Sequence, residues 1–188
     1  MTLRLFAAVV PSEAVLEHLA ALVEPRRDAD DNLRWVRREN WHLTLAFFGD
    51  VPDGRLDPLQ EALGAISGAP LTVTLDGSGA FPNPAAARVL YHAVSTGSDG
   101  LTTLSRSVRT AADRATVPSD NAKQVPHLTL ARTRRTTDVT RWLRVVESFP
   151  AQSFDVTAFT LFQSELRPSG PVYRALHTVP LGPRPRTE

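Results

Sequence analysis

Cysteine does not occur in this chain of 188 residues, and lysine and methionine occur once each. The absence of cysteine excludes disulfide bonds, thiolate metal sites and cysteine nucleophiles. Long apolar runs are missing too, since none approaches the ~20 residues that a membrane-spanning helix needs. The apolar N-terminus has no basic region before it and is ended by Pro11, unlike a signal peptide. We therefore expect a cytoplasmic protein without disulfide bonds.

An excess of charge of one sign is also missing, because 21 basic residues face 20 acidic ones and the net charge is +1. No strong overall field therefore draws the protein to duplex nucleic acid or to a membrane. A nucleic-acid partner would have to be met locally, at an end or a short strand. All basic residues except Lys123 are arginine, which suits phosphate binding, although a codon bias toward arginine explains the same excess.

The composition indicates one folded unit. Hydrophobic residues make up 42% of the chain and charged residues 22%, as in a soluble globular protein that buries a core. Low-complexity segments and long linkers are absent from the sequence. We predict a single bilobal domain over residues 1–182, followed by a flexible tail over residues 183–188.

The hydrophobic pattern changes repeatedly between the periods of strands and helices. Helices are predicted after Ser12 and over residues 56–66, 101–108 and 139–146. A connection rich in glycine and proline is expected over residues 77–84. Strands are predicted at Leu3–Val10, Leu33–Val36, Trp41–Val51, Leu71–Leu75, Val89–Val94, His127–Thr133, Phe154–Phe162 and Val172–Val179. Many of these strands come in pairs whose connections are too short for a crossover helix, so they must be antiparallel. The pattern favours an α+β fold.

A five-residue repeat stands out in the sequence. His42-Leu43-Thr44-Leu45-Ala46 recurs 85 residues later as His127-Leu128-Thr129-Leu130-Ala131. Each copy lies in a predicted strand, where alternate side chains point to opposite faces. The histidine and the threonine of each copy therefore share one face, and the leucines anchor the opposite face in a core. Two such strands would present a matched pair from each side of a cleft.

These residue types suit phosphodiester cleavage. One group must take a proton from the nucleophile and another must protonate the leaving oxygen. Two imidazoles with a pKa near ~6.5 can hold opposite protonation states near neutral pH. Threonine hydroxyls can donate hydrogen bonds to the non-bridging phosphate oxygens, where charge must be held in the transition state. A duplicated structural strand without activity is the alternative reading of the repeat.

The repeat resembles the twin motifs of the two-histidine phosphoesterase superfamily, in particular its RNA 2′,3′-cyclic phosphodiesterase branch, historically called 2′-5′ RNA ligases. The resemblance extends over about residues 3–181. It is carried by further segments outside the two motifs: Arg4–Ala8, Arg34–Val36, Glu39–Asn40, Phe48–Val51, Gly79–Pro84, Arg88–Leu90, Pro126, Ala131–Arg132, Ser164, Leu166 and Gly170–Tyr173.

The resemblance implies two antiparallel β-sheets that line a central cleft, with helices outside and a pseudo-twofold repeat of the motif strand. It also implies hydrolysis of RNA 2′,3′-cyclic phosphate ends to 2′-phosphomonoesters. By the motif, His42 would be the general acid and His127 the general base. Thr44 and Thr129 would hold the phosphate, with assistance from Arg132. The implied partners are RNA 3′ ends or nucleotides bearing a 2′,3′-cyclic phosphate. We expect a monomer without an obligate protein partner and without association with a membrane.

Two further residues are assigned by position along the strands. Strict alternation places Arg132 on the face opposite His127, so its phosphate role requires the strand to end or bulge near Ala131. Phe48, on the same predicted face as His42, is our first candidate for stacking on a base at an RNA end. Of the remaining histidines, His18 falls on the solvent-exposed polar side of the first predicted helix, and His92 and His177 lack a threonine two places on. We expect no catalytic role for them.

No metal ion or other cofactor is expected. A first-row metal needs three or four converging ligands, and each motif offers one histidine beside a neutral threonine. Three functions stay open: the cyclic phosphodiesterase; a related enzyme acting on 2′-5′ oligonucleotides or a small cyclic phosphate, or joining RNA ends; and a non-catalytic RNA-end binder. Turnover of a panel of substrates distinguishes them.

Overall fold

The structure, a computed structural model, describes residues 1–120, 125–168 and 170–182. The predicted tail lies outside these residues, so its flexibility stays a prediction. The helices are α1 (Glu13–Val23), α2 (Leu56–Gly64), α3 (Ser98–Arg114) and α4 (Thr140–Glu147), with short 3₁₀ turns η1 (Glu24–Arg26), η2 (Arg38–Asn40), η3 (Asp53–Arg55) and η4 (Pro84–Ala86). The strands are β1 (Thr2–Val9), β2 (Leu33–Trp35), β3 (Leu43–Pro52), β4 (Leu71–Phe81), β5 (Ala87–Thr96), β6 (His127–Thr137), β7 (Gln152–Val156), β8 (Ala158–Arg167) and β9 (Gly170–Pro180).

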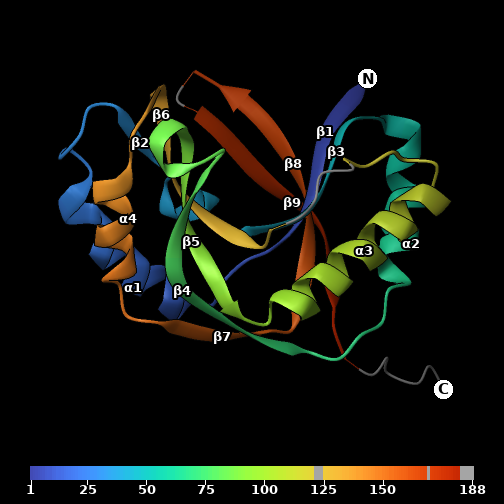
Figure 1. Ribbon diagram of the computed structural model, residues 1–188. Helices are drawn as coiled ribbons and strands as arrows, with labels where there is room; N and C mark the ends of the chain where they lie inside the picture. The colour runs from blue at the N-terminus through green and yellow to red at the C-terminus, as the bar shows by residue number, and fades with distance from the viewer. Residues whose placement is uncertain (121–124, 169, 183–188) are drawn as a thin grey trace.

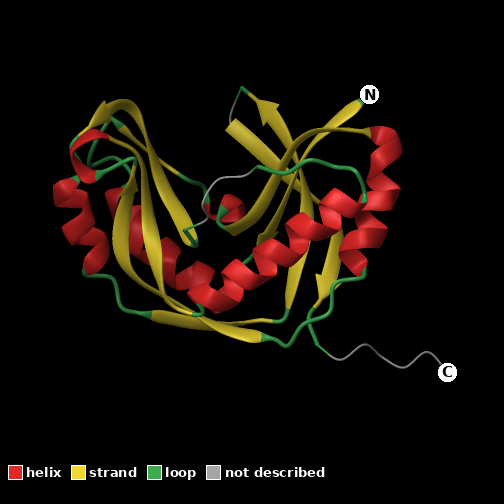
Figure 2. Ribbon diagram, turned by 45° about the vertical axis from the view of Figure 1, so that its right-hand side comes forward, coloured by secondary structure: helices red, strands yellow, loops and turns green. Residues whose placement is uncertain are grey.

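All strand pairs in the described chain are antiparallel, and they follow the order β7-β4-β5-β6-β3-β1-β8-β9, with β2 added on β6. The α+β class with antiparallel strands is therefore confirmed. The two expected sheets meet at one residue pair, Leu43 with Leu128, and so form one curled sheet with two lobes. Figure 1 shows these lobes on either side of the centre, and Figure 2 shows the curl of the strands.

The helices cover the outside of the two lobes. α1 and α4 lie together on one lobe, where α4 packs on β4 and α1 contacts β7. On the other lobe, α3 packs on β3 and α2 contacts α3 and β9. Each helix buries one apolar face, for example Leu59 and Leu63 of α2, which are fully buried. Among the described helices, none has the length and apolar character needed to cross a membrane.

Two predicted element boundaries were wrong, each for a reason of strand pairing. The expected connection over residues 77–84 is largely strand, because β4 passes through a bulge at Gly77 and pairs with β5 as far as Phe81. Gly77 has φ +81°, a conformation that favours glycine. The single strand expected over Phe154–Phe162 is broken at Thr157 into β7, which pairs with β4, and β8, which pairs with β1 in the other lobe.

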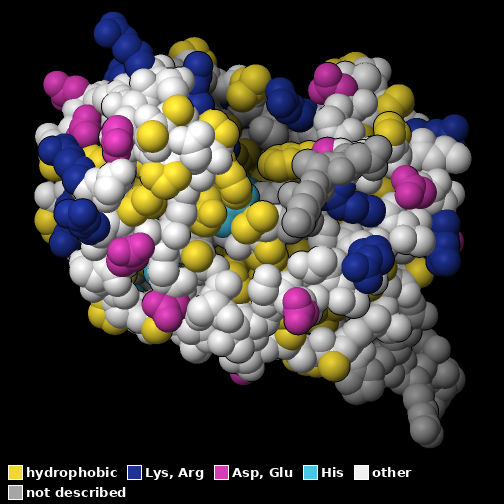
Figure 3. Space-filling view, viewed as in Figure 1, with side chains coloured by type: hydrophobic (Ala, Val, Ile, Leu, Met, Phe, Trp, Pro, Cys, Tyr) yellow, Lys and Arg dark blue, Asp and Glu magenta, His cyan; other side chains and the backbone are white. Residues whose placement is uncertain are grey.

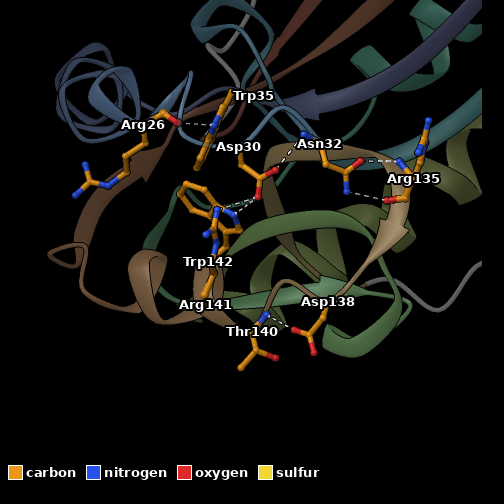
Figure 4. Close-up of polar contacts among 9 residues, drawn as sticks. All are labelled: Arg26, Asp30, Asn32, Trp35, Arg135, Asp138, Thr140, Arg141 and Trp142. Carbon is orange, nitrogen blue, oxygen red and sulfur yellow. Dashed lines mark hydrogen bonds and ion pairs between the residues drawn. The ribbon is translucent and has the colours of Figure 1, made fainter.

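A polar network fastens the segment before β2 to the lobe that carries α4 (Figure 4). Asp30 accepts hydrogen bonds from the indole of Trp142 and the guanidinium of Arg141, both at 3.0 Å. The Asn32 side chain bonds both backbone groups of Arg135, accepting from N at 2.9 Å and donating to O at 3.1 Å. Because these bonds join the segment before β2 to the far part of β6, they hold β2 at the edge of β6.

Candidate active site

The two motif strands lie side by side at the centre of the sheet. Because β3 and β6 are antiparallel and pair only at Leu43 and Leu128, the two copies of the motif are related by a local twofold axis. The motif leucines of both strands are at most 1% exposed, whereas the histidines and threonines are partly exposed toward the cleft. The structure therefore brings His42, Thr44, His127 and Thr129 together on one face, as the repeat predicts.

Each motif is followed by a β-bulge. In β3 the pairing with β1 moves from Thr44 to Ala46, so that Leu45 is the extra residue. In β6 the pairing with β5 moves from Thr129 to Ala131, so that Leu130 is the extra residue. A bulge buries two consecutive side chains and reverses the alternation that follows it. The next residues, Phe47 and Arg132, are therefore exposed on the cleft face at equivalent positions.

The carbonyl oxygen at each bulge has a donor from outside the strand pair. The Leu45 oxygen accepts from the hydroxyl of Ser105 on α3 at 2.5 Å. The Leu130 oxygen accepts from the backbone N–H of Val36 at 2.8 Å. Since buried carbonyls need such partners, both bulges are built into the fold.

The bulges decide the two uncertain positions. The bulge places Arg132 on the cleft face, and so meets the condition that the strand end or bulge near Ala131. The prediction for Phe48 was wrong, because Phe48 is 5% exposed and belongs to the core. Its neighbour Phe47, 50% exposed, lines the cleft instead. Sequence alternation alone carries no sign of the bulge that exchanges the two phenylalanines.

The ring nitrogens of the two histidines have equivalent partners. Nδ1 of His42 lies 2.8 Å from the carbonyl oxygen of Asn40, and Nδ1 of His127 lies 2.7 Å from that of Val125. A carbonyl oxygen can only accept, so each Nδ1 carries the proton. Nε2 of both neutral rings is therefore the nitrogen left to take or give a proton in the cleft.

Aromatic rings surround both histidines. The Phe6 and Tyr173 ring centroids lie 5.0 and 5.4 Å from that of His42. The Phe81 and Tyr91 ring centroids each lie 5.0 Å from that of His127. These four rings were not predicted as site residues. Phe6, Phe81 and Tyr173 lie in segments that carry the family resemblance and Tyr91 does not, but only strand pairing brings the rings to the histidines.

Tyr91 reaches His127 because Gly79, opposite it on β4, has no side chain. A Cβ at Gly79 would lie 2.1 Å from the Tyr91 ring, which stacks instead on Phe81 with a centroid distance of 4.6 Å. Gly79 is thus required for a close approach between a ring and the backbone.

Burial is the main influence on the histidine pKa values. Desolvation lowers the pKa of His42 to about 4, while the hydrogen bond to Asn40 raises it; the charge of His127 in its protonated form and that of Arg132 lower it further by smaller amounts. Desolvation also lowers the pKa of His127, opposed by the bond to Val125 and assisted by Arg132. Both imidazoles are therefore neutral at pH 7 before an anion binds.

The histidines lie in a cleft of about 830 Å³. Figure 3 shows a histidine side chain at the bottom of a hollow that hydrophobic side chains surround. Of the described residues that line the cleft, none is aspartate or glutamate. Five are arginines: Arg4, Arg34, Arg37, Arg132 and Arg134. A chain of net charge +1 thus concentrates positive charge at this cleft, which favours an anionic ligand.

The other histidines do not join the site. His18 lies on α1, His177 lies on β9, and His92 is buried in β5 with Nδ1 at 2.6 Å from the Gly77 oxygen. None of the three lines the cleft. In the described ranges, His, Asp and Glu side chains form no group of three or more that could hold a metal ion.

Comparison with known proteins agrees with this site. The family model of the LigT-like phosphoesterases matches residues 9–91 and 93–173, and each match contains one copy of the motif. An RNA 2′,3′-cyclic phosphodiesterase from Methanothermobacter thermautotrophicus is 30% identical and covers 92% of this chain and 96% of its own. One from Thermus thermophilus is 33% identical and covers 93% and 88%. The crystal structure of Escherichia coli LigT complexed with 3′-AMP has a TM-score of 0.77, is 27% identical and covers 96% of this chain and 99% of its own. The chain belongs to the LigT-like phosphoesterase family.

Proposed function

We propose that this protein hydrolyses the 2′,3′-cyclic phosphate end of RNA to a 2′-phosphomonoester by acid–base catalysis with His42 and His127. The observation that carries the proposal is the pair of Nε2 atoms left free for proton transfer, one from each lobe, in one arginine-lined cleft. Two relatives at 30% identity or more are named for this activity. The LigT structure in complex with 3′-AMP supports a ribonucleotide as ligand.

The reaction needs one neutral and one protonated imidazole. Nε2 of His127 takes a proton from water, and the water oxygen forms a bond to phosphorus. The bond between phosphorus and the 3′ oxygen breaks, and Nε2–H of His42 gives its proton to that oxygen. The products are a 3′-hydroxyl and a 2′-phosphomonoester. The two histidines have exchanged protonation states, which solvent then restores.

Binding of the anionic substrate favours the protonated form of His42 that the general acid requires. The cyclic phosphate is an anion, and an anion beside a buried imidazole raises its pKa. Binding therefore favours protonation of His42, whose pKa is low in the free protein. In our proposal the Thr44 and Thr129 hydroxyls and the Arg132 guanidinium hold the non-bridging oxygens, where charge increases in the transition state.

An RNA 5′-hydroxyl in the place of water would form a 2′-5′ linkage by the same proton transfers. Ligation in vitro is thus compatible with the proposal and does not identify the physiological direction. We propose further that the protein acts as a monomer, since one chain supplies both histidines. We also propose that it acts in the cytoplasm and without a metal ion.

The test is incubation of the purified protein with an oligoribonucleotide that ends in a 2′,3′-cyclic phosphate, followed by ³¹P NMR of the product. We expect a 2′-phosphomonoester. A 3′-phosphomonoester would mean that the other ester bond breaks, and the roles given to the histidines would be wrong. Binding without turnover would support an RNA-end binder instead. Faster turnover of 2′-5′ oligonucleotides would assign the related activity.

A further inference from the structure

Two arginines face each other across β2 and β6 at the edge of the cleft. Arg34 of β2 is the register partner of Arg132 of β6, and both side chains line the cleft. Like charges directly opposite each other in a sheet are destabilising. Arg134 extends the group, because it lies two residues beyond Arg132 on the same face, with Thr133 buried between them.

Carboxylates do not neutralise this group. Across residues 1–120, 125–168 and 170–182, no ion pair involves Arg34, Arg132 or Arg134. Arg37, which also lines the cleft, pairs with Glu39, and Arg38, Arg109, Arg141 and Arg167 outside the cleft each have an acidic partner. Repulsion among these three positive charges lowers the stability of the fold, and a bound anionic ligand would offset this repulsion.

The position of the group distinguishes its members. Arg132 follows the Thr129 motif directly and lowers the pKa of both catalytic histidines, so it lies at the reacting phosphate. Arg34 and Arg134 line the same cleft, Arg34 opposite Arg132 on the edge strand β2 and Arg134 farther along β6. Alternate residues of a strand are ~6.6 Å apart, so Arg134 lies one step farther from the reacting phosphate than Arg132.

The β2–β6 edge is also held rigid. The Asn32 side chain bonds both backbone groups of Arg135, and the backbone N–H of Arg134 donates to the Asn32 oxygen at 2.8 Å. Asp30 fastens the same segment to α4 (Figure 4). Arg34 and Arg134 therefore project from a fixed backbone, as a preorganised binding surface requires.

We propose that Arg34 and Arg134 form a second subsite that binds the backbone phosphates of the RNA strand preceding the cyclic end. This inference rests on the proposed function and deepens it, since it makes an RNA strand, rather than a cyclic mononucleotide, the preferred substrate. A basic surface that follows a single-stranded backbone binds without regard to sequence. Neutralised strand phosphates release counterions, so the preference for a strand decreases with salt.

The test compares two substrates with the same reacting group: a nucleoside 2′,3′-cyclic phosphate and a ten-residue oligoribonucleotide that ends in one. We expect kcat/KM to be higher for the oligonucleotide. In the R34Q/R134Q variant we expect this advantage to fall about tenfold or more, and the slope of log kcat/KM against log salt to decrease by about 0.7 per lost phosphate contact. R106Q/R144Q is the matched control, since it also removes two arginines, which are exposed on α3 and α4 and do not line the cleft.

The outcomes are separable. No turnover of either substrate by the wild-type protein would refute the proposed function itself. Equal kcat/KM for both substrates in the wild type would overturn the subsite while leaving the proposed function intact. An equal loss on both substrates in R34Q/R134Q would also overturn it, because the arginines would then act only at the reacting phosphate. Equal binding of a polyglutamate peptide and the oligonucleotide, measured by fluorescence anisotropy, would argue for an acidic peptide in place of RNA.

Discussion

Asn40 connects His42 to the hairpin of β8 and β9. Its backbone oxygen lies 2.8 Å from Nδ1 of His42, and its side-chain amide donates to the Pro171 oxygen at 2.9 Å. Asn40 is 7% exposed, and β9 carries Tyr173, whose ring contacts that of His42. The equivalent residue before His127 is Val125, which is 44% exposed and has no side-chain amide. The two halves of the repeat thus hold their histidines differently.

Replacement of Asn40 by alanine should lower kcat by up to ~10²-fold, because small misplacement of a catalytic group is costly. Loss of the bond to Pro171 should also admit water and raise the pKa of His42 from about 4 toward 6.5. NMR titration of the His42 ring measures this shift. Asn32→Ala is the control: it should lower Tm and leave the His42 pKa unchanged. Unchanged kcat and pKa in Asn40→Ala would show that Asn40 has no positioning role.

Either His42→Ala or His127→Ala should remove most of the activity, since a lost general acid or base typically costs ~10²–10⁴-fold. The double variant should be little worse than either single one, because the two groups act as a unit. Steady-state kinetics on the cyclic-phosphate oligonucleotide measure both effects, and circular dichroism checks folding. His177→Asn is the control, because His177 lies outside the cleft. His92→Asn is unsuitable, because His92 is fully buried. A folded single variant with near-normal kcat would contradict the role of that histidine.

The pH dependence follows from the lowered histidine pKa values. The active form carries one proton on the pair, and this form is most populated between two macroscopic pKa values that both lie below 6.5. We therefore expect kcat/KM to be larger at pH 6 than at pH 8. The kcat profile should lie at higher pH, because the bound phosphate raises both pKa values. Arg132→Gln should move the basic limb of kcat/KM upward, since its charge lowers both pKa values. A kcat/KM that rises from pH 6 to pH 8 would contradict this assignment.

Phe47 and Phe48 provide a matched pair of substitutions. Phe48→Ala removes a core side chain and should destabilise the protein by ~3–5 kcal/mol. Phe47→Ala removes a half-exposed ring from the cleft and should leave Tm nearly unchanged. If Phe47 stacks on a base, its loss should weaken substrate binding by ~1–3 kcal/mol. Thermal unfolding and KM measure the two effects. The reverse result, with KM affected only at position 48, would restore the sequence-based assignment.

Activity should survive exhaustive treatment with a chelator, because general acid–base catalysis by two imidazoles requires no metal ion. Turnover of the cyclic-phosphate substrate is measured before and after chelation, and again after Mg²⁺, Mn²⁺ or Zn²⁺ is returned. We expect no change at any step. Loss in chelator that a stoichiometric metal restores would turn His42 and His127 into ligands.

Much of the site was predictable from the motif repeat. The side-chain period of a strand places His42 and Thr44 on one face and the leucines on the other, and the structure agrees. The bulges were not predictable, because each depends on a donor from a distant segment, Ser105 for β3 and Val36 for β6. A bulge reverses the alternation of the residues that follow it up to the next register shift, so Phe48 was misassigned, and Arg132 could be placed only conditionally.

The sequence by itself determined the chemistry: two histidines that can exchange protons, two hydroxyls beside them, and leucines that bury the strands behind them. These follow from residue type and from the local geometry of a strand, which the chain carries wherever it lies. Only the tertiary structure decided which residues share the cleft with them. The position of Phe47, the aromatic rings around the histidines and the facing pair Arg34 and Arg132 all depend on strand register. Register is a property of two segments together, so neither segment specifies it alone.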